Sequence, residues 1–156
     1  MIANCDQYID ASIDTYLDDM DRRHLDGLIM TLYSDDRKWS FAAVDDKGYV
    51  TDVQEKVVIS PHATVGIYNY KSGAGFVEGA EKMIALDQRV NGEFYVAPVY
   101  KPMIDNGKKI GIFGIGAENN GMYGLGTPND LESFLRLPIA ERAVAFATRQ
   151  KTLSKE

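Results

Sequence analysis

The sequence predicts an α/β fold in which helices pack on a sheet. Short apolar runs rich in β-branched residues alternate along the chain with segments whose apolar residues recur at helical spacing, and this alternation is typical of such folds. The 156 residues, 45% of them hydrophobic, suit one domain with a buried core. No repeat, low-complexity tract or Pro-, Gly- or Ser-rich linker divides the chain.

The first half of the chain is expected to contribute one helix and several strands. The helix is amphipathic, with an acidic solvent face between apolar residues at helical spacing: Ile9, Ile13, Tyr16, Leu17 and Met20. Residues 28–33 form a continuous apolar run, which is typical of a strand buried on both faces. Residues 40–44 and 49–53 should pair as a hairpin around an Asp-Asp-Lys-Gly turn, and residues 63–70 form the next strand. Ile2–Ala3 has the character of the tail of a buried strand.

The second half begins with two helices and a strand. Residues 76–84 carry apolar side chains at helical spacing. A longer helix is predicted over Glu93–Asn106, with Pro98 in its first part and Gly107 as its C-terminal stop. Residues 109–115 are expected to form a strand that returns to the sheet.

Two helix starts are predicted near the end of the chain. Thr127 can cap a helix, Pro128 suits its first position, and Asp130 stands at the capping-box spacing. Pro138 opens a last helix. The glycines at 124–126 just before Thr127 suit either an anion site at the helix N-terminus or a tight turn.

Charge and composition argue against several classes of protein. The 17 Lys and Arg against 23 Asp and Glu give a net charge of −6, which disfavours binding to nucleic acid or to an anionic membrane. No apolar run approaches the roughly 20 residues that span a bilayer. Cys5 is the single cysteine, so neither an internal disulfide nor a cysteine-based zinc site is expected. These features together favour a cytoplasmic protein.

Several polar residues stand where ligands are bound in α/β folds. Asp6 follows the predicted strand tail, where a carboxylate can hold Mg²⁺ bound to phosphates, although the local pattern alone favours a turn or a helix cap. Lys56 can meet a phosphate and Glu55 can accept sugar hydroxyls, or the two can form a solvated charge pair. Asn91 and Glu93 can reach a sugar or cap the predicted helix.

Six short motifs follow one another along the chain: Ile2–Gln7, Lys38–Ala42, Val53–Lys56, Ala63–Tyr68, Arg89–Val96 and Gly124–Leu131. Their order and spacing resemble the sugar-phosphate nucleotidyltransferases, especially the branch found with capsule and surface-polysaccharide genes. On this resemblance residues 1–136 form the C-terminal portion of a nucleotidyltransferase-like domain. Residues 137–156 form a helical tail without a counterpart in the family.

The resemblance implies a Rossmann-like α/β domain of the glycosyltransferase-A type and a phosphoryl-transfer reaction. Members of the family join a sugar 1-phosphate to a nucleoside triphosphate and release pyrophosphate. The sugar phosphate attacks the α-phosphorus in line while Mg²⁺ bridges the phosphates, and the protein supplies placement and charge neutralisation. A sugar phosphate or a nucleotide sugar is therefore the expected ligand, and Mg²⁺ the expected cofactor.

The same resemblance assigns roles to individual residues. Asp6 matches the family's Mg²⁺-binding aspartate, and both Asp6 and Lys56 would be catalytic, with Lys56 meeting a phosphate. Ser40 and Gly66 mark places where the sugar faces the main chain. The implied substrate-binding set is Ser40, Glu55, Gly66, Asn91 and Glu93.

Two departures from the family pattern bear on activity. Only five residues precede Asp6, so the family's glycine-rich, arginine-containing phosphate loop has no match, and Gly124 stands where many relatives carry a second metal-binding aspartate. The chain is therefore expected to be the rear portion of a longer enzyme and to be inactive or incomplete as given. A sheet edge bared in this way would favour a homodimer or higher oligomer. A non-catalytic oligomeric interaction module and a glycosyltransferase that uses a sugar nucleotide are the alternative functions.

Overall fold

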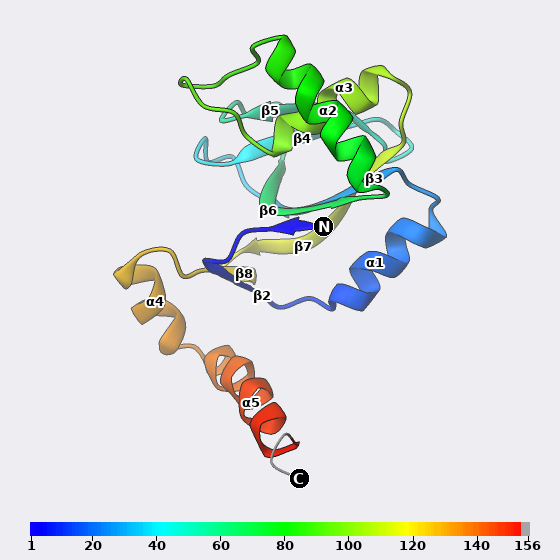
Figure 1. Ribbon diagram of the computed structural model, residues 1–156. Coiled ribbons are helices and arrows are strands. Elements are labelled where there is room, and N and C mark those ends of the chain that lie inside the picture. Colours follow the sequence, from blue (N-terminus) through cyan, green and yellow to red (C-terminus); the bar gives the residue numbers. More distant parts are fainter. Residues whose placement is uncertain (154–156) are drawn as a thin grey trace.

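Eight strands form one mixed sheet in the computed structural model, with α1 on one side and α2 and α3 on the other (Figure 1). The structure describes the backbone of residues 1–153 and the side chains of residues 1–145. The strands are β1 (Ile2–Ala3), β2 (Gln7–Ile9), β3 (Gly27–Tyr33), β4 (Ser40–Val44), β5 (Val50–Glu55), β6 (His62–Tyr70), β7 (Ile110–Glu118) and β8 (Gly121–Gly124). The helices are α1 (Ile13–Arg22), α2 (Gly73–Ala85), the 3₁₀ turn η1 (Ala97–Val99), α3 (Tyr100–Asp105), α4 (Pro128–Leu135) and α5 (Pro138–Leu153).

The strand β3 lies near the middle of the sheet, whose order is β2-β8-β7-β3-β6-β4-β5. It pairs in parallel with β7 and antiparallel with β6. The short β1 also pairs with β6, and Tyr68 faces both Ile2 of β1 and Ile29 of β3, so these two strands lie on opposite edges of β6. The predicted α/β class, with helices packed on a sheet, is confirmed, and the sheet is mixed.

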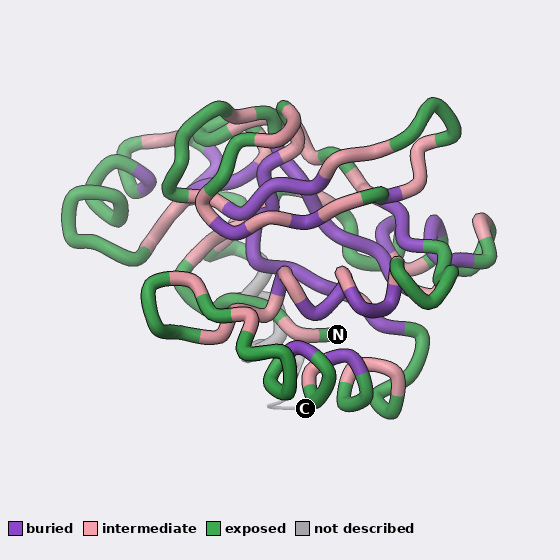
Figure 2. Tube along the Cα trace, turned by 90° about the horizontal axis from the view of Figure 1, so that it is seen from above, coloured by how far each residue is buried: buried purple, intermediate pink, exposed green. Residues whose placement is uncertain are grey.

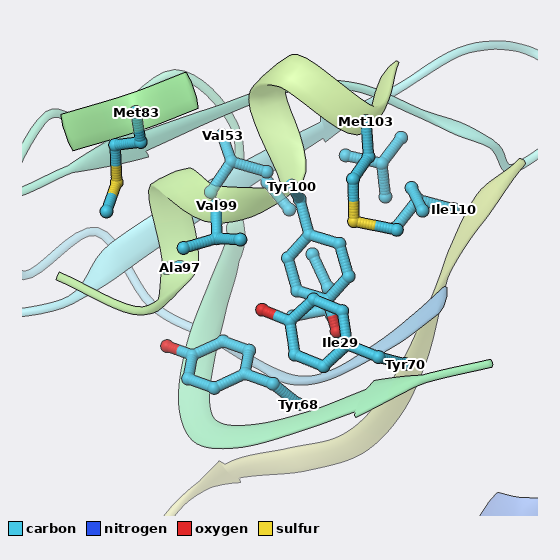
Figure 3. Close-up of a cluster of buried hydrophobic side chains, with 12 residues drawn as sticks. Ile29, Val53, Tyr68, Tyr70, Met83, Ala97, Val99, Tyr100, Met103 and Ile110 are labelled. Carbon is cyan, nitrogen blue, oxygen red and sulfur yellow. The ribbon is translucent and has the colours of Figure 1, made fainter. Parts of the chain in front are cut away.

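A cluster of aromatic and aliphatic side chains joins β6 to η1 and α3 (Figure 3). The rings of Tyr70 and Tyr100 stack with centroids 4.5 Å apart. The Tyr100 hydroxyl donates to the main-chain oxygen of Asn69 at 2.9 Å, so this buried polar group is satisfied. This packing fixes the start of α3, and with it residues 95–97, against the sheet.

The opposite face of the sheet is covered by α1, whose apolar side packs on the strands. Buried residues gather in the middle of the molecule, with exposed residues around them (Figure 2). Ser12 caps the helix by accepting from the Thr15 amide at 3.2 Å. The buried Tyr16 hydroxyl donates to the Leu28 carbonyl at 2.5 Å. Near the helix end, Arg23 pairs with Asp19 at 3.0 Å and donates to the Ile112 carbonyl of β7 at 3.1 Å, which ties the helix to the sheet.

The first two strands differ from the sequence-based expectation. Ile2 is only half-buried and Ala3 is exposed, so Ile2–Ala3 is a strand but not a buried one. Ile9 belongs to β2 rather than to the first helix, which begins at Ile13 after the Ser12 cap. The strands β2 and β8 were not predicted, because they are short and pair with each other across more than 100 residues of chain.

The helix expected over Glu93–Asn106 is wrong in its first part. Asn91 and Gly92 have positive φ angles of 52° and 81° and form a two-residue turn. Val90 and Glu93 exchange two main-chain hydrogen bonds across this turn. This is the reversal that an Asn-Gly pair favours, and it leaves helical structure only from Ala97 onward.

The remaining elements match the predictions closely. The β4–β5 hairpin, the long strand β6, the helix α2 and the Thr127-capped α4 all form where they were expected. The helices α4 and α5 extend from the β8 end of the sheet, away from α2 and α3 (Figure 1). Among the described residues, no helix has the length and apolar character needed to cross a bilayer.

Candidate functional site

The β4–β5 hairpin brings a serine and a glutamate together at the edge of the main core. Ser40 opens β4, Glu55 closes β5, and the two are directly paired in the ladder. Both are buried, with Glu55 only 7% exposed, and the Ser40 hydroxyl donates to a carboxylate oxygen of Glu55. A buried carboxylate held by a neutral donor keeps its remaining acceptor capacity for a further partner.

These two side chains belong to a pocket of about 300 Å³ that is lined by β1, the start of β4, the end of β5, the middle of β6 and residues 95–97. The pocket combines main-chain, hydroxyl, amide, carboxylate and aromatic groups, a mixture that suits a small polar ligand. Its lining comprises Ile2, Asn4, Lys38, Trp39, Ser40, Glu55, Thr64, Gly66, Tyr68, Tyr95, Val96 and Ala97. Ser40, Glu55 and Gly66, three of the residues predicted to bind substrate, thus line one cavity.

Two hydroxyls from β6 add to the buried polar part of the pocket. Thr64 and Tyr68 share a hydrogen bond of 2.9 Å, and both are buried. Burial raises the pKa of Tyr68 to about 12, and the nearby negative charge of Glu55 acts in the same direction. The Tyr68 hydroxyl therefore stays protonated at neutral pH and can both donate and accept.

Lys56 does not line the pocket itself but lies at its rim, next to Glu55 and hydrogen-bonded to Tyr95. The backbone of Lys56 is in the left-handed region with φ 58°, and its amide donates to the Trp39 carbonyl at 3.1 Å. Its ammonium donates to the Tyr95 hydroxyl at 3.1 Å, which in turn donates to Glu93 at 2.9 Å. The hydrogen bond to Tyr95 raises the pKa of Lys56 above its usual value.

Gly66 is required by the close approach of β1 to β6. Its φ is +74°, and an added Cβ would lie 2.2 Å from Nδ2 of Asn4. The main-chain amide of Asn4 also donates to the main-chain carbonyl of Gly66 at 3.0 Å. The space over Gly66 is therefore taken by Asn4 in this structure, and a ligand approaching the main chain there would meet the Asn4 side chain.

Trp39 and Lys38 form the wall of the pocket that comes from the β3–β4 loop. The indole Nε1 of Trp39 is a buried side-chain donor without a partner among the described residues. Lys38 lies over the Trp39 ring, 5.0 Å from its centroid, and its ammonium donates to Glu118 at 2.8 Å. The ion pair with Glu118 raises the pKa of Lys38 and holds this cation at the pocket.

Asp6 lies away from this lining, at the start of α4. Its side chain is exposed, its carbonyl accepts from the Leu125 amide at 2.8 Å, and its carboxylate would lie 2.9 Å from a Cβ added to Gly126. Within the described part of the chain, no three His, Cys, Asp or Glu residues are grouped to hold a metal ion. A single exposed carboxylate fits a Mg²⁺ ion that takes most of its ligands from substrate phosphates and water.

The structure connects one of the two residues predicted from the Arg89–Val96 segment to the pocket. Glu93 reaches it indirectly, through Tyr95. Asn91 is exposed, serves the tight turn and does not line the pocket. The predictions missed Tyr95 as a pocket residue, as well as Thr64 and Tyr68, whose i,i+4 spacing on one strand face was the available signal.

Comparisons with known proteins support the fold. No protein-family model matches the chain, and no curated protein matches it. Among solved structures, a nucleoside-diphosphate-sugar pyrophosphorylase from Vibrio cholerae RC9 matches with a TM-score of 0.73 and 24% identity, over 86% of this chain and 55% of that one. A Bacillus anthracis protein described as a glucose-1-phosphate thymidylyltransferase, solved in complex with sucrose, matches with a TM-score of 0.60 and 16% identity, over 82% of this chain and 49% of that one. The chain thus has the fold of part of a sugar nucleotidyltransferase and spans about half the length of these structures.

Proposed function

We propose that this chain is the sugar-phosphate-binding portion of a sugar nucleotidyltransferase. The whole protein would transfer a nucleoside monophosphate from a nucleoside triphosphate to a sugar 1-phosphate and release pyrophosphate. The likeness in fold to two sugar nucleotidyltransferases supports this family of reactions. The chain spans only about half of each of these two structures. The experiment below therefore tests this chain for binding of a sugar phosphate and not for the complete transfer reaction.

One observation supports the proposal most directly: two adjacent residues, Glu55 and Lys56, place a buried carboxylate and a lysine at the same pocket. Glu55 contributes its carboxylate to the buried part, while Lys56 is hydrogen-bonded to the pocket residue Tyr95. A sugar phosphate has complementary chemistry, since its hydroxyls donate and its phosphate is anionic. The positive φ of Lys56 turns the chain sharply between the two side chains.

The residues of this chain would act by placement and charge neutralisation. The Glu55 carboxylate, oriented by the Ser40 hydroxyl, accepts hydrogen bonds from sugar hydroxyls. The Lys56 ammonium balances phosphate charge at the rim. Holding the sugar phosphate in this way aligns its oxygen for in-line attack and lowers the entropic cost of the transfer.

Mg²⁺ would be held by Asp6 together with phosphate oxygens of the substrates. When bound, the ion neutralises phosphate charge that builds up during the transfer. Asp6 is exposed and free to orient toward such a ligand, and the glycine at position 126 leaves room beside its carboxylate.

Calorimetric titration with glucose 1-phosphate tests the proposed function. We expect binding that is weakened about tenfold or more by Lys56→Ala, because one charge-assisted contact is lost. Glu55→Gln should also weaken binding, since an amide replaces the anionic acceptor. Lys47→Ala is the matched control, because Lys47 is an exposed lysine in the β4–β5 turn, outside the pocket lining.

Two results would contradict the proposal. One is the absence of binding to glucose 1-phosphate and to a panel of other sugar 1-phosphates. The other is binding that neither Lys56→Ala nor Glu55→Gln reduces relative to Lys47→Ala.

A further inference from the structure

The lysine at the rim of the pocket is held by a chain of two hydrogen bonds that ends on a carboxylate. The Lys56 ammonium lies 3.1 Å from the Tyr95 hydroxyl, and that hydroxyl lies 2.9 Å from Oε2 of Glu93. An ammonium can only donate and a carboxylate can only accept, so the direction of both bonds is fixed. Tyr95 must accept from Lys56 and donate to Glu93.

The Tyr95 ring also supports Lys56 directly. The ammonium lies 5.0 Å from the ring centroid, within the range of a cation–π contact. Tyr95 therefore offers Lys56 two attractive groups, its hydroxyl and its ring face. Of the members of this chain of contacts, only Tyr95 lines the pocket.

Two features of the backbone place Tyr95 for this role. The turn at Asn91–Gly92 reverses the chain and presents Glu93 two residues before Tyr95. Two residues after Tyr95, η1 begins with the buried Ala97, which anchors the segment to the core. Glu93 and Tyr95 thus stand on a short segment that is fixed at both ends.

A lysine side chain that is not held in this way samples many rotamers, and ordering it on binding costs conformational entropy. The hydrogen bond to Tyr95 reduces that cost in advance. It also stabilises the charged form, since the contacts with Tyr95, and after them the charges of Glu55 and Glu93, raise the pKa of Lys56.

We propose that Tyr95 is a positioning residue for the proposed sugar-phosphate site. It holds the Lys56 ammonium at the pocket rim, with Glu93 orienting its hydroxyl. This inference rests on the proposed function, because it assigns to Lys56 the phosphate of the same ligand. It changes the expected role of Glu93 from a direct sugar contact to a group that acts through Tyr95.

A double-mutant cycle with glucose 1-phosphate tests this role. We expect Tyr95→Phe to weaken binding about fivefold to tenfold when Lys56 is present and to have no further effect in the Lys56→Ala background. Glu93→Gln, which keeps an acceptor for the Tyr95 hydroxyl, should weaken binding less than Glu93→Ala. Tyr33→Phe is the matched control, because Tyr33 is 63% exposed and does not line the pocket.

A second measurement needs no ligand and separates positioning from a general structural effect. Nuclear magnetic resonance titration of the Lys56 side chain should show a lower pKa in Tyr95→Phe than in the unsubstituted chain. Tyr33→Phe should leave the Lys56 pKa unchanged. A merely structural role of Tyr95 would alter the stability of the fold without this specific shift.

The outcomes distinguish failure of this inference from failure of the proposed function. If Lys56→Ala weakens binding but Tyr95→Phe does not, the role of Tyr95 is overturned and the proposed function stands. If Tyr95→Phe weakens binding equally with and without Lys56, Tyr95 contacts the ligand directly and positioning is overturned. If the unsubstituted chain binds no sugar 1-phosphate, the proposed function is overturned together with the phosphate role of Lys56.

Discussion

At the scale of single residues, backbone conformation decides where the pocket can form. Gly66, within β6, and Lys56, directly after the end of β5, both have positive φ, at +74° and 58°. A glycine adopts this region without penalty, whereas a lysine there is under mild strain that the surrounding structure must offset. The strained lysine coincides with the position proposed to meet the phosphate.

Gly66→Ala should destabilise the chain by about 2 kcal/mol, because the new Cβ requires a left-handed backbone and meets the Asn4 side chain. Urea denaturation measures the change. Part of the loss should return when Asn4→Ala removes the clash, while the backbone cost remains. Gly73→Ala is the control, since no atom lies within 4 Å of its added Cβ. Equal effects at positions 66 and 73 would refute this account of Gly66.

At the scale of elements, local patterns predicted most helices and strands, and contacts between distant segments explain the failures. The β4–β5 hairpin follows from its turn residues and from alternation within the strands, whereas the Ser40–Glu55 pair depends on a register shift between Ala43 and Val44 that these patterns do not predict. The Asn91–Gly92 pair is an equally local turn signal, but the helix predicted from Glu93 rested on Pro98 and Gly107 and left this signal unused. The short strand β2 exists only because β8 is beside it, and no local pattern reveals that.

The same distinction applies to the candidate site. Family motifs indicated Glu55, Lys56, Ser40 and Gly66, because these residues lie in short segments that resemble motifs of the family. The contact between Lys56 and Tyr95 joins residues 39 positions apart, so it depends on how η1 packs against the sheet. No local sequence pattern could therefore predict this contact.

The start of α4 provides a test at this scale. The Thr127 hydroxyl accepts from the Asp130 amide at 3.2 Å and caps the helix that follows the segment beside Asp6. We expect Thr127→Ala to lower the free energy of unfolding by about 1 kcal/mol, whereas Thr127→Ser, which keeps the hydroxyl, should cost much less. Denaturation curves of both variants measure the difference. A loss of the same size in both would show that the cap hydroxyl is not the cause.

At the scale of the whole molecule, buried tyrosines tie the two faces of the sheet to their helices. Burial raises the pKa of each of four such side chains: Tyr16, Tyr68, Tyr70 and Tyr100. Tyr16 belongs to α1 on one side of the sheet, and Tyr100 begins α3 on the other side. Ionisation of these hydroxyls would place charge in both cores at once.

Stability should therefore fall in alkaline solution. A tyrosine whose pKa is higher in the folded state contributes stability that is complete below the unfolded pKa of 10.0 and is lost as the pH rises toward its folded value, about 12 for Tyr68. Tyr68 alone accounts for roughly 2 to 3 kcal/mol between these limits. Urea denaturation at pH 8, 10 and 11, with tyrosinate absorbance followed in parallel, measures the slope. Tyr68→Phe should flatten it relative to the unsubstituted chain, because the variant has one fewer buried hydroxyl to ionise on unfolding; an identical slope in both would mean that Tyr68 ionises as readily in the folded core as in the unfolded chain.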